Sequence, residues 1–180
     1  MKTKLILAIL LSTAFLGFSQ SKKMTKTGDV KFEASVPSFE EVKAQNSTTT
    51  VVLNTDNGDI AALALMKGFR FKVALMEEHF NENYIESDKY PKATFKGKID
   101  NFDMSKLSEA EKEFTINGTL ELHGKSKKIT APAKIKKSGD SIYLTSAFSV
   151  NSDDFAIEIP QIVSKKVSKK VNINVDCVLK

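Results

Sequence analysis

Apolar and polar residues alternate along most of this chain, which is the period of a strand that buries one face. Between Phe114 and Leu122, for example, every second residue is apolar or glycine and the residues between them are polar. The same pattern predicts eight strands, at residues 29–36, 47–54, 60–75, 92–102, 114–122, 129–136, 142–150 and 171–179. Turn sequences separate several of them, and Asn57-Gly58 is the strongest because this pair accepts the positive φ angles of a tight hairpin.

Little helix is predicted, so the predicted sheet has no second layer to cover its apolar face and must cover itself. We therefore expect an all-β fold, an eight-stranded antiparallel barrel, with a sandwich as the alternative. Such a barrel has an interior just wide enough for side chains or one slim ligand. Small residues on the expected inward faces would leave space there, and they are Ala62, Ala64, Ala93, Gly97, Gly118, Ala131 and Ala133.

Residues 76–97 interrupt the alternation. Phe80, Tyr84 and Ile85 lie at i, i+4 and i+5, which predicts a short helical cap with one apolar side. Tyr90-Pro91 is expected to end this helix, because a residue before proline avoids the α region. From Lys92 the period returns to two.

The longest apolar segment, residues 60–75, has an ambiguous pattern. Lys67 breaks its apolar row, and the adjacent Gly68 predicts a bulge or bend within one long strand. A buried helix over residues 60–66 is the alternative, because alanine and leucine also favour helix.

The first 19 residues are predicted to be a signal peptide. Lys2 and Lys4 precede an apolar run, residues 5–18, that is too short for a stable transmembrane helix, and Ser19 suits cleavage before Gln20. A membrane anchor is the less favoured reading. Residues 20–28 are polar and basic and are predicted to be a flexible arm, which leaves residues 29–180 as the barrel domain. We expect the mature protein to be periplasmic or secreted.

Three motifs resemble those of a known family. They are Met76-Glu77-Glu78-His79-Phe80 followed by Tyr90-Pro91-Lys92-Ala93-Thr94-Phe95, then Gly118-Thr119-Leu120-Glu121-Leu122-His123-Gly124, and then Asp154-Phe155-Ala156-Ile157. In this order and spacing they resemble the YceI-like family, over roughly residue 30 to the C-terminus. The resemblance implies a secreted or periplasmic lipocalin-like barrel that binds polyisoprenoids. Many members open with a Trp-containing strand, whereas this chain has no Trp.

The alternation and the family resemblance together give candidates for the ligand-binding interior. They are Leu63, Leu65, Phe69, Phe71, Leu75, Phe95, Leu120, Ile142, Phe148 and Phe155, with Phe80 of the cap closing one mouth. The expected function is to carry or store an apolar lipid, such as a polyisoprenoid or the tail of an isoprenoid quinone. One alternative is an enzyme that acts on such a lipid, with His79 and Glu77 or Glu78 as acid–base groups. Another is a filled barrel that binds a partner protein.

Composition and charge indicate how many domains the chain forms and which partners it is expected to bind. The chain has 180 residues, 41% of them hydrophobic, and a formal net charge of +5, which suits one globular domain. Its single arginine, Arg70, argues against nucleic-acid binding. Its lysine runs are typical of a solvated surface, and weak contact with anionic lipid headgroups is the alternative. The oligomeric state is left open.

No catalytic group, metal site or cofactor is predicted. Zinc needs three or four ligands, and the supply is thin, with only His79, His123 and one cysteine, Cys177, that is expected to be buried. Both histidines are expected to be hydrogen-bonded at corners of the fold. Cys177 alternates in phase with Val175 and Leu179, so we expect a buried and unreactive thiol.

Overall fold

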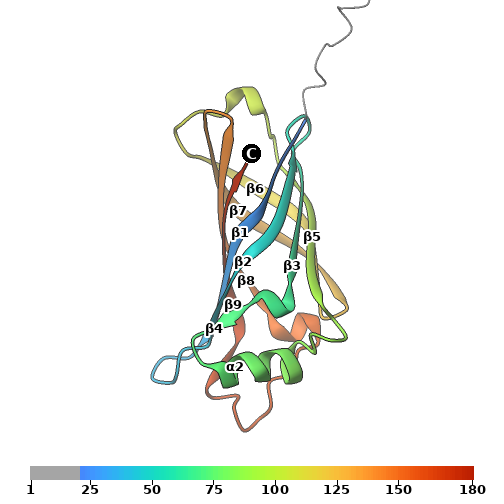
Figure 1. Ribbon diagram of the computed structural model, residues 1–180, viewed down its shortest axis with the longest axis vertical. Helices are drawn as coiled ribbons and strands as arrows, with labels where there is room; N and C mark the ends of the chain where they lie inside the picture. Colours follow the sequence, from blue (N-terminus) through green and yellow to red (C-terminus); the bar gives the residue numbers. More distant parts are fainter. Residues whose placement is uncertain (1–20) are drawn as a thin grey trace, which may run out of the picture.

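The structure is a computed structural model that describes residues 21–180. Eight long strands form a closed antiparallel barrel, and this confirms the predicted fold class (Figure 1). Around the barrel the order is β1-β9-β8-β7-β6-β5-β3-β2, and β2 pairs back with β1. The strands are Lys22–Ser35 (β1), Lys43–Asn54 (β2), Asp59–Leu65 (β3), Lys92–Ile99 (β5), Lys112–Leu122 (β6), Lys125–Ser138 (β7), Ser141–Asn151 (β8) and Val167–Leu179 (β9). The predicted signal peptide, residues 1–19, lies outside the described residues.

The first strand begins earlier than predicted. β1 starts at Lys22, so most of the expected flexible arm is part of the barrel wall. The backbone N–H of Met24 donates to the carbonyl oxygen of Lys180 at 3.0 Å, and the Lys180 N–H donates to the Met24 carbonyl at 3.0 Å. These bonds use main-chain groups, which every sequence has, so the polar side chains of this segment gave no sign of them.

The predicted long strand over residues 60–75 is wrong in its second half. β3 ends at Leu65, a 3₁₀ turn (η1, Met66–Gly68) follows, and the two-residue strand β4 (Arg70–Phe71) pairs with β2. The chain turns around Asn46, whose Nδ2 donates to the Leu65 carbonyl at 2.9 Å. A Cβ on Gly68 would lie 2.6 Å from that Nδ2, so only glycine fits against Asn46.

A helical cap lies at one end of the barrel (Figure 1). Helix α2 (Ala74–His79) continues into a π-helical turn, η2 (Phe80–Tyr84), so the helix ends before the predicted Tyr90-Pro91. The Glu77 carboxylate fixes the cap to β4, since it accepts from Arg70 Nη1 at 2.7 Å and from the Phe71 N–H at 3.1 Å. Within residues 21–180, no helix has the length and apolar character needed to cross a membrane.

The two ends of the barrel interior are filled differently. The end away from the cap, which we call the packed end, contains fully buried branched side chains: Leu53, Ile99, Ile135, Ile142 and Leu179. The connection between β5 and β6, with the 3₁₀ turn η3 (Met104–Lys106), covers it with Phe102, Met104 and Leu107. The end beside the cap, the hollow end, contains alanines and a group of phenylalanines that surround a cavity.

Candidate functional site: an apolar cavity inside the barrel

A cavity of about 450 Å³ lies inside the barrel and opens at the hollow end. Every long strand contributes to its lining, because the inward positions of β1, β2, β3, β5, β6, β7, β8 and β9 all reach it. Alanines stand where the packed end has larger residues, and Ala62, Ala64, Ala93 and Ala131 all line the cavity. Short side chains on the inner face therefore create the space.

Four phenylalanines close the side of the cavity beneath the cap. The Phe80 ring stacks on Phe32 with centroids 5.4 Å apart, and it lies 5.9 Å from Phe69 and 5.1 Å from Phe71. Phe80 thus holds the cap against β1 and β4. Phe80 covers part of this end of the barrel, and the cavity stays open beside it, so Phe80 alone does not close this mouth, contrary to the expectation.

The open mouth lies between the cap and two loops. Exposed Phe39 and Glu40 come from the β1–β2 connection, and exposed Lys166 comes from the connection between β8 and β9. His79 of α2 also faces this opening. Within residues 21–180, Glu40, His79 and Lys166 are the only acidic, basic or imidazole side chains in the lining, and all three are exposed at the mouth.

Among protein-family models, that of the YceI-like domain matches residues 12–179 of this chain. The chain belongs to the YceI-like domain family. Compared with curated proteins, the chain has no match.

Solved structures share the fold of this YceI-like chain. A polyisoprenoid binding domain from Saccharophagus degradans implicated in plant cell wall breakdown is 13% identical, with a TM-score of 0.77 over 89% of this chain and 98% of that chain. BcnA of Burkholderia cenocepacia is 13% identical, with a TM-score of 0.70 over 85% and 96%. The YceI protein of Campylobacter jejuni is 18% identical, with a TM-score of 0.63 over 79% and 86%. At these identities the likeness shows the fold alone.

Most of the candidate ligand-binding residues lie around the cavity. Those that line it are Phe69, Phe71, Phe80, Phe95, Leu120, Phe148 and Phe155. Leu63 and Leu65 do not, because β3 turns Ala62 and Ala64 inward and its leucines outward, which leaves Leu65 54% exposed. Leu75 lies on α2 and is 56% exposed, and Ile142 is buried in the packed end. Whether the seven lining residues bind a ligand stays a prediction.

Some residues that line the cavity of this YceI-like barrel were not among the candidates predicted from the sequence. β1 contributes Val30 and Phe32, and β9 contributes Val171, Ile173 and Val175. Their alternation was visible in the sequence, and closure of the barrel makes both strands inner walls. Ile159 and Val163 also line the cavity, but they lie in the loop before β9, where no periodicity could have marked them.

Two predicted gaps in the lining are filled. Gly97 and Gly118 face each other across β5 and β6, and the ring of Phe95 lies over both. A Cβ on Gly118 would lie 2.3 Å from Phe95 Cζ, and one on Gly97 would lie 2.7 Å from the same atom. These glycines therefore make room for a phenylalanine ring in the wall rather than for a ligand.

The two histidines differ. His123 is hydrogen-bonded as predicted: its Nδ1 lies 2.9 Å from the Phe155 carbonyl oxygen and its Nε2 lies 3.0 Å from Glu86 Oε2. His79 is exposed, and its ring has no hydrogen bond within residues 21–180, so the corner role expected of it belongs to Glu77. No group of three metal-ligating side chains occurs in this described part of the chain.

The acidic segment after β8 forms a 3₁₀ turn, η4 (Ser152–Phe155). Its cap is Asn151, whose Oδ1 accepts from the Asp153 N–H at 3.0 Å. The Ser152 side chain belongs to the cavity lining, where its hydroxyl is buried and finds no hydrogen-bond partner in the described part of the chain.

Cys177 is buried, as predicted. Burial raises the pKa of its thiol to about 12, and the nearby Asp176 carboxylate adds to the rise. The side chain lies where the cavity meets the packed end.

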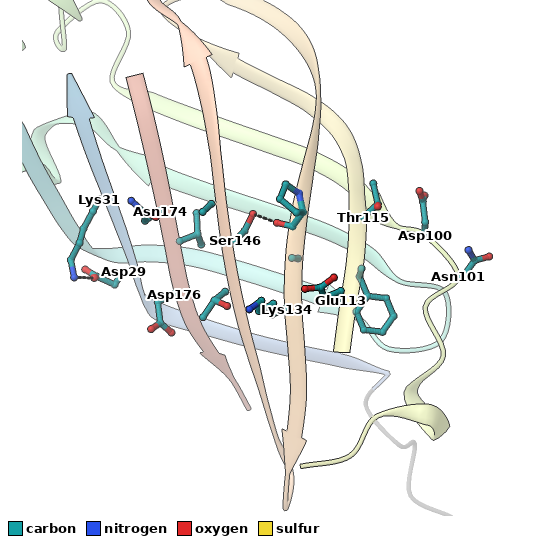
Figure 2. A pocket seen from close by; sticks show the side chains of 16 residues that line it. Asp29, Lys31, Asp100, Asn101, Glu113, Thr115, Lys134, Ser146, Asn174 and Asp176 are labelled. Atoms are coloured by element: carbon teal, nitrogen blue, oxygen red, sulfur yellow. Dashed lines mark hydrogen bonds and ion pairs between the residues drawn. The ribbon is translucent and has the colours of Figure 1, made fainter. Parts of the chain in front are cut away.

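A second hollow, of about 910 Å³, lies on the outer surface of the barrel (Figure 2). It crosses β1, β9, β8, β7 and β6 near the point where the β7–β8 ladder stops, and there Ser146 Oγ donates to the Pro132 carbonyl at 2.7 Å. Its lining mixes acids with lysines, as in the Lys31–Asp29 pair at 3.1 Å. Partial burial alone would raise the pKa of Asp29, but hydrogen bonds from Gln45, Lys31 and Ser47 hold it below its usual value.

Proposed function

We propose that this protein is an exported lipid-binding protein that holds a long apolar chain inside the barrel, in a carrier or storage role. The observation that carries this proposal is the apolar cavity, whose charged side chains all stand at the mouth. Burial of a hydrocarbon chain contributes about 0.8 kcal/mol per CH₂ group. A chain of ten or more such groups would therefore bind without any charged contact inside.

A polyisoprenoid, or the tail of an isoprenoid quinone, is the ligand class we favour. Its support comes from family membership and from the name of one relative with the same fold, a polyisoprenoid binding domain. The lining of the cavity is compatible with this choice, because phenylalanine and alanine side chains suit a branched hydrocarbon. The same lining favours binding over catalysis, since none of the described residues forms a pair of acid–base side chains inside the cavity.

Mass spectrometry of the protein purified from its own envelope tests the ligand class. The spectrum should contain a protein–lipid complex, and the extracted lipid should carry a long branched or unsaturated hydrocarbon chain. A protein that is always free of lipid, in native spectra and after incubation with isoprenoid alcohols, would contradict the proposal.

Weak contact with a membrane surface is part of this proposal. Near the mouth, Ile162 is 88% exposed and Phe39 is 45% exposed, beside Lys165 and Lys166. Exposed apolar side chains among lysines suit the boundary between headgroups and acyl chains of an anionic bilayer. Glu40 on the same rim opposes this attraction, so we expect the contact to be weak and sensitive to salt.

Vesicle flotation tests this contact. The protein should float with vesicles that contain phosphatidylglycerol at low salt, and Ile162→Glu should reduce the floated fraction. Met24→Glu, which adds the same charge at an exposed apolar residue of the β1 segment that pairs with the C-terminal Lys180, is the matched control. Equal loss in both variants would contradict docking through the mouth.

Export rests on the sequence of the first 19 residues alone. N-terminal sequencing of protein from the envelope fraction should begin near Gln20. Recovery of a chain that still carries Met1 would contradict cleavage.

A further inference from the structure

The inner end of the cavity, where it meets the packed end, is called here the blind end. It contains a buried hydroxyl, that of Thr49, within an otherwise apolar lining. Thr49 is 2% exposed, lines the cavity, and shares the inward face of β2 with Val51 and Leu53. Its Oγ1 is buried and has no hydrogen-bond partner among residues 21–180. A buried hydroxyl without a partner is destabilising, because it has lost its bonds to water and gained none in return.

Strand pairing places Thr49 far from the mouth. Thr49 pairs with Gly28 of β1, and on the other side of β1 the next residue, Asp29, pairs with Asp176 of β9. Cys177 in turn pairs with Leu144 of β8. Thr49, Cys177 and Leu144 therefore lie in one row across the wall, where the cavity meets the packed end.

The surroundings of this hydroxyl are neutral and apolar. The wall beside Thr49 is closely packed around Gly28, its partner on β1: a Cβ placed on Gly28 would lie 2.9 Å from the Thr49 carbonyl oxygen, 3.4 Å from Val51 Cγ2 and 3.6 Å from Cys177 Cβ. The raised pKa of the Cys177 thiol, about 12, has burial as its main cause, so an anion is disfavoured here. Among the residues that the structure describes, no lysine, arginine or histidine lines this part of the cavity.

We infer that the blind end binds a neutral hydrogen-bonding group, a hydroxyl or a carbonyl, on the inner end of the apolar ligand, and that Thr49 Oγ1 is its partner. The hydroxyl of threonine donates to a carbonyl oxygen and accepts from an alcohol, so it suits either group. This inference rests on the proposed lipid-binding function and adds the direction of the ligand. A charged end, such as a phosphate, would stay at the mouth near Lys166.

The hydroxyl of Ser152, which also lacks a partner within residues 21–180, would suit a ligand bound in the opposite direction. Ser152 begins η4, close to the cap rather than to the packed end, and its buried Oγ also lines the cavity. A ligand whose polar group stayed near the mouth would hydrogen-bond Ser152 and leave Thr49 unpaired. Substitutions at the two residues therefore distinguish the two directions.

The test compares phytanol with phytane, which have the same branched skeleton with and without a terminal hydroxyl. Each competes with a fluorescent apolar probe for the purified, delipidated protein, and the variants are Thr49→Val, Ser152→Ala and the outward-facing neighbour Thr50→Val as control. Threonine and valine have nearly the same shape, so Thr49→Val removes the hydroxyl without filling or emptying the cavity. Thermal unfolding without ligand confirms that each variant is folded, and Thr49→Val should unfold at the same or a higher temperature than wild type.

We expect wild type to bind phytanol about tenfold more tightly than phytane, because phytane leaves the Thr49 hydroxyl unpaired. Thr49→Val should remove this preference by weakening phytanol binding alone, whereas Thr50→Val should keep it. If wild type binds both compounds equally, the inference is wrong and the lipid-binding proposal stands. If Ser152→Ala removes the preference and Thr49→Val does not, the ligand has the opposite direction. If wild type binds neither, both proposals fall.

Discussion

The packed end and the hollow end of this barrel are formed by the same strands with the same alternation, yet one is solid and the other holds a cavity. In β7, Ile135 is fully buried in the packed end, while Ala131, four residues earlier on the same face, lines the cavity. In β3, Ala62 and Ala64 stand at the hollow end. Alternation thus decides which side chains point inward, and their size decides whether a ligand has room.

The two ends are also held together differently. Branched aliphatic side chains form the buried core of the packed end. The hollow end relies on stacked phenylalanines and on the His123 imidazole, which joins the β6–β7 turn to Glu86 and to η4. We therefore expect truncations to affect stability most at the packed end, and bulky additions to affect lipid binding most at the hollow end.

The largest effect expected is that of Ile135→Ala. This change leaves a void among fully buried neighbours and should lower the free energy of unfolding by about 2–5 kcal/mol. Phe148→Ala removes a larger side chain that already borders the cavity, so fewer neighbours lose contacts and the cost should be smaller. Urea unfolding of both delipidated variants checks this order, and an equal or larger loss for Phe148→Ala would contradict the distinction between the two ends.

A smaller effect is expected at the imidazole of the hollow end. His123 has a φ of 50°, which asparagine accepts more readily than alanine does, so His123→Asn removes the ring with little backbone strain. The variant leaves the Phe155 carbonyl and Glu86 without this partner and should lose about 1–3 kcal/mol of unfolding free energy. His79→Ala, at an exposed side chain, should change it by less than about 0.5 kcal/mol and should still bind lipid. If His79→Ala alone abolished activity on a lipid substrate, the enzymatic alternative would be favoured over the carrier role.

At the boundary between the two ends, the effect expected near neutral pH is on the reactivity of the Cys177 thiol rather than on stability. Because the pKa of the Cys177 thiol is about 12 instead of 9.0, its thiolate fraction at pH 8 should be about a thousandfold lower than in the unfolded chain. A thiol reagent should therefore label native protein slowly and denatured protein quickly. Fast labelling of the native protein would show that the boundary is open to solvent.

The Cys177 thiol also makes the free energy of unfolding depend on pH. Its folded pKa lies above its unfolded one, so its contribution to stability is complete below pH 9.0 and is lost as the pH rises toward 12. Cys177→Val should make the free energy of unfolding fall less steeply over this range. An unchanged slope would contradict the burial of the thiol.

Much of the barrel could be predicted from the sequence because alternation reports a buried face directly. The strands from β5 to β9 have the predicted inward faces, and Leu120, Phe148 and Phe155 lie where they were expected. Alternation failed where main-chain or tertiary contacts decide the structure. The first residues of β1 are recruited by backbone bonds to the C-terminus, and Asn46 with Gly68 breaks the segment that was expected to continue from β3.

The cavity itself could not be predicted with the same success. An inward alanine or glycine leaves space only if no neighbour fills it, and this depends on side chains from other strands. Gly97 and Gly118 are filled by the ring of Phe95, whereas Ala93 borders the cavity. Ala133 is small but lies in the packed end, so it offers no space either.

Bound lipid in Ala93→Phe and Ala133→Phe, measured with thermal stability, tests the central claim that the cavity carries the function. Ala93→Phe places a ring in empty space, so it should lower the lipid bound per protein while the melting temperature stays close to that of wild type. Ala133→Phe overpacks the solid end and should lose about 1–3 kcal/mol of stability while the folded protein still binds lipid. If Ala93→Phe is destabilised and binds as much lipid as wild type, the cavity is not the lipid site.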